Sequence, residues 1–297
     1  MMGVLGDKLI EFARANPSIV KPIRRPLLAL YHHSHRREQQ LIADLFTTLS
    51  GLLVEDVCIR VEEFGGHFYL DPRSAVLRRI VVDGSYEPQL TRLCEQYVDR
   101  GRDVLDVGAN VGFHAVFFAN LLTDRKVLAV EPTSRALARL KRNLQANGVS
   151  DRVLVQHGAV SDQDSQIEIK TILGKEEFSS MGQIHHPAAQ GEAVQIENVR
   201  AQTLDSLVAE HELNPGFLKV DVEGFEHAVI RGADQVLAKH RPAIMAELSD
   251  PLLRANGSSA AAVVDMIAAY DYEVTDPLRP AIKPGTREFG DILCVPR

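Results

Sequence analysis

From position 103 onward, the apolar residues of this chain form short runs of strand length, and the segments between the runs carry apolar residues at helical spacing. Five runs predict the core strands of a sheet, at 103–107, 126–130, 153–157, 217–222 and 243–247. Two more, at 272–275 and 291–296, are expected to pair at the edge of that sheet. Helices are expected at 89–97, 113–122, 134–146, 204–210, 226–240 and 259–270. This alternation predicts an α/β fold, with a mostly parallel sheet covered by helices on both faces.

Hydroxyl residues stand before three of the expected helices, where their oxygens accept hydrogen bonds from backbone N–H groups of the first turn. We expect Thr133 or Ser134 to cap the helix that ends at residue 146. Thr203 is expected to cap the helix at 204–210, and Ser258 or Ser259 the helix that ends at residue 270.

The first 55 residues follow a different pattern and are interpreted as a helical appendage to a main domain at 56–297. Residues 8–15 and 38–53 carry apolar positions at helical spacing. Three prolines, Pro17, Pro22 and Pro26, are expected to break the path between these two helices.

Two segments of the main domain alternate in the manner of β-hairpins. In the first, residues 57–70, Gly65 and Gly66 form the expected turn. In the second, residues 163–200, alternating stretches flank a polar stretch at 178–186. We interpret the second segment as a hairpin insertion or lid.

Composition and charge narrow the functional classes. The 297 residues are 45% hydrophobic, enough for one large domain or a domain with an appendage. A net charge of −7 and the lack of Trp disfavour a general nucleic-acid binder, so no nucleic-acid partner is expected. Three scattered cysteines, no apolar run near the roughly 20 residues of a transmembrane helix and no signal-peptide layout predict a cytoplasmic protein without a transmembrane segment.

Residues 21–37 are locally basic, with five Lys or Arg, three His and no acid. Such a segment is typical of sites that dock an acidic partner or membrane headgroups. The alternative is a solvated cap over the main domain, and this is the interpretation we favour.

The segment 104–112, VLDVGANVG, predicts a buried strand that enters a tight turn, in which Gly108 and Gly112 allow close approach of a ligand. The next strand ends in Glu131, which is placed to accept hydrogen bonds from ribose hydroxyls. The turn lacks the glycine triplet of pyrophosphate sites, and Asp106 just inside it would repel a pyrophosphate. These residues favour a cationic cofactor without phosphate, such as S-adenosylmethionine. A purely structural turn is the alternative.

The segment 218–226, LKVDVEGFE, places a second set of charges at the same edge of the sheet. Because residues two apart share a face of a strand, Lys219, Asp221 and Glu223 are expected on one side. Asp221 is expected beside the glycine turn, where it contacts the cofactor and, with Glu223, orients a substrate hydroxyl or takes its proton. In the alternative, Lys219 pairs with an acid inside the site, and the acids only shape the pocket. Acids also end three other strands, at Asp106, Glu131 and Glu247.

These motifs resemble those of FkbM-type methyltransferases, a branch of the class I S-adenosylmethionine-dependent fold, and the resemblance covers about residues 65–297. It lies in the order and spacing of GSYEP at 84–88, VLDVGANVG at 104–112, VEP at 130–132, GAVSD at 158–162, SS at 179–180, TLD at 203–205, KVDVEGFE at 219–226 and RP at 241–242 followed by Glu247. It implies a Rossmann-like sheet of seven strands with the last antiparallel, and S-adenosylmethionine as cofactor. The implied reaction is methyl transfer to a hydroxyl oxygen of a sugar, glycolipid or secondary metabolite.

The resemblance also assigns residues to the cofactor. Along the cofactor it implies Tyr86 and Glu87 over the methionine end, Asp106, Gly108 and Asn110 at the methionine and ribose, Glu131 at the ribose diol, and Ala159, Val160 and Asp162 at the adenine. His114 stands where many relatives have a small hydroxyl or aromatic residue, and it is a candidate substrate contact or base.

Several histidines and three rival functional classes offer alternatives. His157 is expected to be structural, and His185 and His186 to be solvated in the insertion rather than in contact with substrate. No His or Cys cluster has metal-ligand spacing, so no metal is expected. The rival functions are an NAD(P)-dependent oxidoreductase, a non-catalytic binding or scaffold protein on the same fold, and a nucleic-acid methyltransferase. The oligomeric state stays open.

Overall fold

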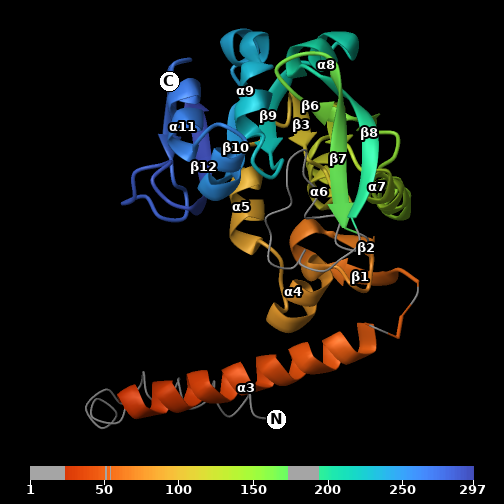
Figure 1. Cartoon of the computed structure of the whole chain (residues 1–297), viewed down its shortest axis with the longest axis vertical. Coiled ribbons are helices and arrows are strands. Elements are labelled where there is room, and N and C mark those ends of the chain that lie inside the picture. The colour runs from red at the N-terminus through yellow and green to blue at the C-terminus, as the bar shows by residue number, and fades with distance from the viewer. Residues whose placement is uncertain (1–23, 51, 54, 173–193) are drawn as a thin grey trace.

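A seven-stranded sheet forms the centre of the computed structural model, which describes residues 24–50, 52–53, 55–172 and 194–297 (Figure 1). The strand order is β11-β12-β10-β9-β3-β4-β5. In chain order the strands are β3 (Asp103–Val107), β4 (Val127–Glu131), β5 (Val153–His157), β9 (Pro215–Val220), β10 (Ala243–Ser249), β11 (Tyr272–Thr275) and β12 (Phe289–Pro296). Neighbours from β10 to β5 run parallel, whereas β12 is antiparallel to both β10 and β11. The predicted class I sheet with its antiparallel last strand is therefore confirmed.

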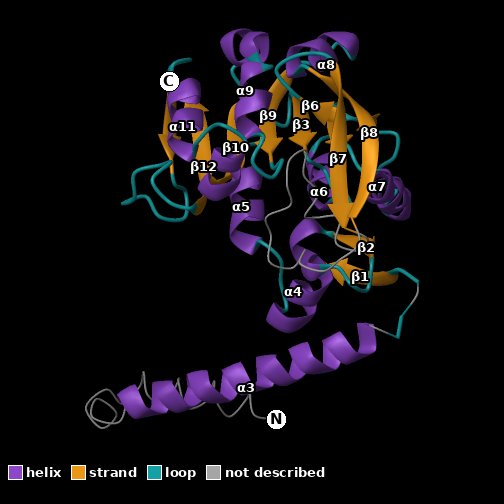
Figure 2. Cartoon of the chain, viewed as in Figure 1, coloured by secondary structure: helices purple, strands orange, loops and turns teal. Residues whose placement is uncertain are grey.

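Helices cover both faces of this sheet, as Figure 2 shows. Because successive side chains of a strand point to opposite faces, Val104 joins one apolar core and Leu105 the other. The first core contains side chains of α5 (Pro88–Tyr97), α6 (Phe113–Leu121) and α7 (Ser134–Ala146). The second contains those of α8 (Leu204–Glu210), α9 (Glu226–Arg231) and α11 (Ala260–Ala268). Strands β3, β4 and β9 are buried along their whole length, which explains their unbroken apolar pattern.

Three features of this domain differ from the sequence prediction. The single helix expected at 226–240 is wrong, since α9 ends at Arg231 and a π-helical segment, η4 (Val236–His240), follows. Strand β9 ends at Val220, two residues before the predicted end. Two short helices, α4 (Ala75–Asp83) and α10 (Asp250–Ala255), were not predicted.

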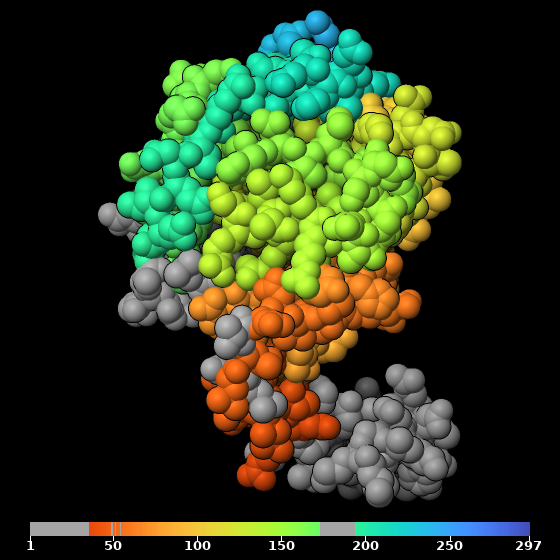
Figure 3. Space-filling model, turned by 90° about the vertical axis from the view of Figure 1, so that its right-hand side faces the viewer, coloured from red at the N-terminus to blue at the C-terminus, as the bar shows by residue number. Residues whose placement is uncertain are grey.

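The hairpin predicted at 57–70 is present and is joined to α7. Its strands β1 (Val57–Val61) and β2 (Gly66–Leu70) pair antiparallel, and the short 3-10 helix η1 (Glu62–Phe64) connects them. The Asn143 carboxamide oxygen accepts from the Tyr69 N–H at 2.7 Å, and Asn147 accepts from the His67 N–H at 2.9 Å. These side chains take the place of a neighbouring strand at the outer edge of β2. In the space-filling view the orange hairpin accordingly lies against the yellow-green α7 (Figure 3).

The N-terminal appendage contains one long described helix, α3 (Arg24–Ser50), which projects below the domain in Figure 1. The expected break at Pro26 is wrong, because Pro26 lies in the first turn of α3, where backbone N–H groups have no acceptor within the helix. Near its other end, Ala43 is buried and Phe46 packs against the first core. The helix predicted at 8–15, with Pro17 and Pro22, lies outside the described residues. Among the helices that are described, none combines the length and apolar character of a membrane span.

The two strands of the predicted insertion join β6 in a small sheet of order β6-β8-β7. Its strands are β6 (Ala159–Val160), β7 (Ser165–Ile172) and β8 (Val194–Gln202). β7 and β8 pair antiparallel, so the arms of the expected hairpin are confirmed. His185 and His186, together with Ser179 and Ser180, fall in 173–193, outside the described residues, and the role of a lid stays a prediction.

Candidate active site

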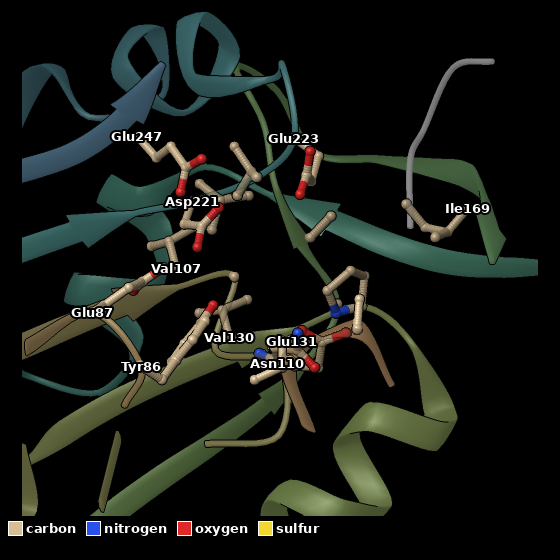
Figure 4. A pocket seen from close by; sticks show the side chains of 18 of the residues that line it. Tyr86, Glu87, Val107, Asn110, Val130, Glu131, Ile169, Asp221, Glu223 and Glu247 are labelled. Carbon is tan, nitrogen blue, oxygen red and sulfur yellow. Dashed lines mark hydrogen bonds between the residues drawn. The ribbon is translucent and has the colours of Figure 1, made fainter. Parts of the chain in front are cut away.

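A cavity of about 270 Å³ lies at the carboxyl ends of the central strands (Figure 4). This is the edge at which open α/β sheets bind their ligands. The glycine turn after β3, the ends of β4, β9 and β10, the start of β6 and the helix α4 contribute to its wall. The residues predicted for the site that line it are Tyr86, Glu87, Gly108, Asn110, Glu131, Ala159, Val160, Asp221, Glu223 and Glu247.

Glu131, at the end of β4, is held by three hydrogen bonds. One carboxylate oxygen accepts from the Thr133 N–H at 2.9 Å and from the Thr133 hydroxyl at 2.7 Å, and the other accepts from the Asn110 N–H at 2.8 Å. Burial raises the pKa of Glu131 to about 7, although these donors oppose the rise. A carboxylate has about four acceptor positions, so the second oxygen retains one for a ligand hydroxyl.

The expected cap of α7 is wrong for a reason that concerns this site. Thr133 stands at the N-cap position, but its hydroxyl donates to Glu131 and makes no cap hydrogen bond. The Ser134 N–H instead donates at 3.0 Å to the carboxylate of Glu197, a residue of β8. The hairpin insertion thus supplies the cap, and the Thr133 hydroxyl is available to orient Glu131.

The turn after β3 has a backbone that few side chains tolerate. Gly108 has a φ of 81°, and a Cβ there would lie 1.8 Å from the backbone oxygen of Asp221. Asn110, Glu87 and Glu223 also have positive φ values, of 48°, 51° and 51°, and all three line the cavity. Strained backbone of this kind concentrates at ligand sites, where the surrounding structure enforces it.

Three acids gather at the ends of β9 and β10. Figure 4 shows Asp221, Glu223 and Glu247 on one side of the cavity, with Asp221 nearest to the glycine turn. The charge of Asp221, followed by burial, raises the pKa of Glu247 well above its ordinary value. Burial and the charge of Asp221 also raise the pKa of Glu87. This part of the cavity favours cations and groups that donate hydrogen bonds.

Lys219 lies behind these acids, beneath the lining. Its ammonium is 3.2 Å from the Asp221 carboxylate and 3.8 Å from that of Asp106. Although burial opposes its charge, the carboxylates of Asp221 and Asp106 raise the pKa of Lys219. The pairing of Lys219 with acids of the site, one of the two sequence interpretations, is therefore present.

Four predicted site residues do not line the cavity. Asp106 is fully buried against Lys219, and Gly112 packs on Leu140 of α7. His114 is enclosed by aromatic rings, with its ring centre 5.0 Å from that of Phe64, and burial lowers its pKa well below the ordinary value. Asp162 forms an ion pair with Arg231 at 3.1 Å.

Other residues of the lining were missed by the sequence reasoning. Ala75, Val76 and Arg79 come from α4, and Ile169 comes from the insertion. Ser74 caps α4 by accepting from the backbone N–H groups of Val76 and Leu77, which is an ordinary helix-start signal. The Ser74 cap predicts that a helix begins there, but it does not predict which face of that helix lines the cavity. Among the described residues, no group of His, Cys, Asp and Glu side chains is arranged to hold a metal ion.

We expect Thr133→Val to shift the pH dependence of cofactor binding. We expect the ionised form of Glu131 to accept a hydrogen bond from the ribose of the implied cofactor, so affinity for S-adenosylhomocysteine should fall as the pH drops through about 7. Loss of the Thr133 hydroxyl removes a donor that lowers this pKa, so the midpoint should move up by about one pH unit. Isothermal titration between pH 5.5 and 9 measures the midpoint.

Thr133→Ser, which keeps the hydroxyl, is the matched control and should retain the wild-type midpoint. If Thr133→Val lowered affinity equally at every pH, its hydroxyl would have only a structural role.

Comparison with known proteins supports one class of enzyme. A family model described as the methyltransferase FkbM domain matches residues 106–274. The chain is 28% identical over 178 residues to the 2-O-methyltransferase NoeI of Sinorhizobium fredii, which covers 57% of this chain and 72% of NoeI. It is 35% identical over 80 residues to a probable protein arginine N-methyltransferase 6 of Arabidopsis thaliana, covering 27% of this chain and 18% of that protein.

Solved structures include a methyltransferase FkbM from Methylobacillus flagellatus KT, at 15% identity and a TM-score of 0.41. That match covers 65% of this chain but only 43% of the other, so the chain spans less than half of that structure.

Proposed function

The chain belongs to the family of FkbM methyltransferase domains, enzymes that depend on S-adenosylmethionine, and from this premise we propose that it methylates a hydroxyl oxygen on a sugar-bearing small molecule or glycan. The observation that carries the proposal is Asp221, a carboxylate in the lining whose Oδ2 is held by Lys219. In the described part of the chain no residue donates to its Oδ1, which leaves that oxygen for the hydroxyl of an acceptor. The name of NoeI, a 2-O-methyltransferase, supports oxygen as the acceptor atom.

The residues present fit S-adenosylmethionine. Glu131 retains an acceptor position for a ribose hydroxyl, and the glycine turn allows the backbone to approach a ligand. The apolar side chains of Val130, Val160 and Ile169 offer contacts for an adenine ring. When bound, the cofactor supplies an electrophilic methyl group on a sulfonium centre. Neither the family match nor the lining favours a nicotinamide cofactor.

We assign the proton transfer to Asp221. Lys219 stabilises the charge of the Asp221 carboxylate from behind, and Glu247 lies beside Asp221 in the lining. The hydroxyl oxygen of the acceptor gains the methyl group, and its proton passes to Oδ1 of Asp221. Glu223 lies close enough in the lining to orient a second hydroxyl of the acceptor.

The acid-rich lining also restricts the acceptor. Carboxylates accept hydrogen bonds from hydroxyl groups, and they repel phosphate and carboxylate groups. We therefore expect a neutral or amine-bearing polyol, such as an unsubstituted glycoside, in preference to a phosphorylated sugar.

Isothermal titration with S-adenosylhomocysteine, comparing wild type with Glu131→Ala, tests the cofactor site. Removal of this buried acceptor leaves the Thr133 and Asn110 donors unpaired, so we expect affinity to fall by ~1–3 kcal/mol, or roughly 5- to 150-fold. Glu273→Ala, which removes an exposed acid from the distant strand β11, is the matched control. Equal affinity for wild type and Glu131→Ala, or binding of NAD(P) in place of S-adenosylhomocysteine, would contradict the assignment.

A further inference from the structure

The charges around the cavity are strongly unequal. The described lining holds five carboxyl groups, those of Glu87, Glu131, Asp221, Glu223 and Glu247, and a single cation, Arg79. The methionine moiety of the cofactor carries three charges, an ammonium, a sulfonium and an α-carboxylate. The acids suit the two cationic groups, but they repel the carboxylate. A site of this composition needs a cation where the carboxylate lies.

Arg79 lies at the end of the cavity where that carboxylate is expected. Its guanidinium is 3.8 Å from the Glu87 carboxylate, and its guanidinium carbon is 5.2 Å from the centre of the Tyr86 ring. The resemblance to FkbM-type methyltransferases implies that Tyr86 and Glu87 lie at the methionine end of the cofactor. Arg79 is therefore adjacent to the part of the ligand that has an anionic group.

The support of Arg79 is rigid, although its side chain reaches the mouth of the cavity. Helix α4 begins with Ser74 as its cap, and Leu77 anchors it in the first core. The Arg79 side chain is 54% exposed, so a ligand at the mouth has access to it. A guanidinium has five N–H donors in a planar fork that matches a carboxylate, and one long contact to Glu87 leaves donors for a second anion.

We propose that Arg79 binds the α-carboxylate of the methionine moiety of S-adenosylmethionine and thereby selects cofactors that retain this group. The proposal rests on the proposed function, because it takes its orientation from ribose at Glu131 and methionine at Glu87. Arg79 of α4 would thus supply the contact to an anionic group that the acids of the described lining cannot make.

The test is a binding cycle that combines protein variants with ligand variants. Affinities for S-adenosylhomocysteine and for its decarboxylated analogue, which keeps the amine, are measured by isothermal titration. Wild type should prefer S-adenosylhomocysteine by about 10- to 100-fold, the range for a hydrogen bond between charged groups. In Arg79→Gln this preference should fall below about threefold, while affinity for the decarboxylated analogue stays within about twofold of wild type.

Arg78→Gln is the matched control, because Arg78 is the preceding residue of the same helix and is exposed outside the lining. It should retain the full preference. Equal loss of affinity for both ligands in Arg79→Gln would overturn the proposal, and so would an unchanged preference. If wild type bound neither ligand, the proposed function itself would fail.

Discussion

Lys219→Met should lower the free energy of unfolding by about 3–5 kcal/mol at pH 8, the largest stability effect that we expect for a single substitution in this site. The substitution keeps much of the volume of the side chain but removes a buried cation that faces two carboxylates. Asp106, which is fully buried and has no hydrogen-bond partner among the described residues, would lose its compensating charge. Urea denaturation followed by circular dichroism measures the loss.

The pH dependence of this loss identifies its cause. Burial already raises the pKa of Asp106 to about 6, above its unfolded value, and Lys219 opposes that rise. An acid with a raised folded pKa favours the protonated form in the fold, so its stability cost appears as the pH rises from the unfolded pKa to the folded pKa. Without Lys219 this window extends above pH 6. The variant should therefore be closer to wild type at pH 5 than at pH 8.

Two further variants separate the ion pair from packing. Lys219→Met combined with Asp106→Asn removes both charges and should recover part of the loss at pH 8, with a weaker pH dependence. Lys239→Met, in the exposed part of η4, should change stability by less than about 0.5 kcal/mol. A Lys219→Met protein as stable as wild type at pH 8 would show that Asp106 is neutral in the native state.

Much of the sheet could be predicted because its strands are buried on both faces. β3 and β4 are buried along their whole length and are mostly apolar. The glycine turn between β3 and α6 is visible in the sequence. Acids at strand ends, such as Glu131 and Asp221, could be placed at one edge for the same reason. The carboxyl ends of parallel strands meet there, so sequence position becomes position in space.

The parts that failed depend on contacts between segments far apart in the sequence. Thr133 has the pattern of a helix cap, and only the distant Glu197 explains why its hydroxyl serves Glu131 instead. Asp106 was expected just inside the turn, but it belongs to β3 and its carboxylate faces Lys219, behind the lining. Arg79 lies on a helix without any motif, and its role follows only from the charges that the fold gathers around it.

Asp221→Asn should lower kcat by about 10²- to 10⁴-fold, the usual contribution of a positioned general base. The amide has nearly the same shape as the carboxylate but cannot accept the proton of an acceptor hydroxyl. S-adenosylhomocysteine should bind the variant within about threefold of wild type, because Glu131 and the glycine turn are unchanged. Transfer of a labelled methyl group to a panel of methyl glycosides identifies an acceptor and then measures kcat.

Two outcomes distinguish a base from a ligand of the cofactor. If Asp221 takes the proton, the residual activity of Asp221→Asn should rise with pH, because hydroxide or an ionised acceptor replaces the missing base. Glu223→Gln, which changes a neighbouring acid of the lining, should raise KM more than it lowers kcat if Glu223 only orients the acceptor. Near-normal kcat with weakened S-adenosylhomocysteine binding in Asp221→Asn would instead show that Asp221 contacts the cofactor. Another acid of the lining would then have to accept the proton of the acceptor hydroxyl.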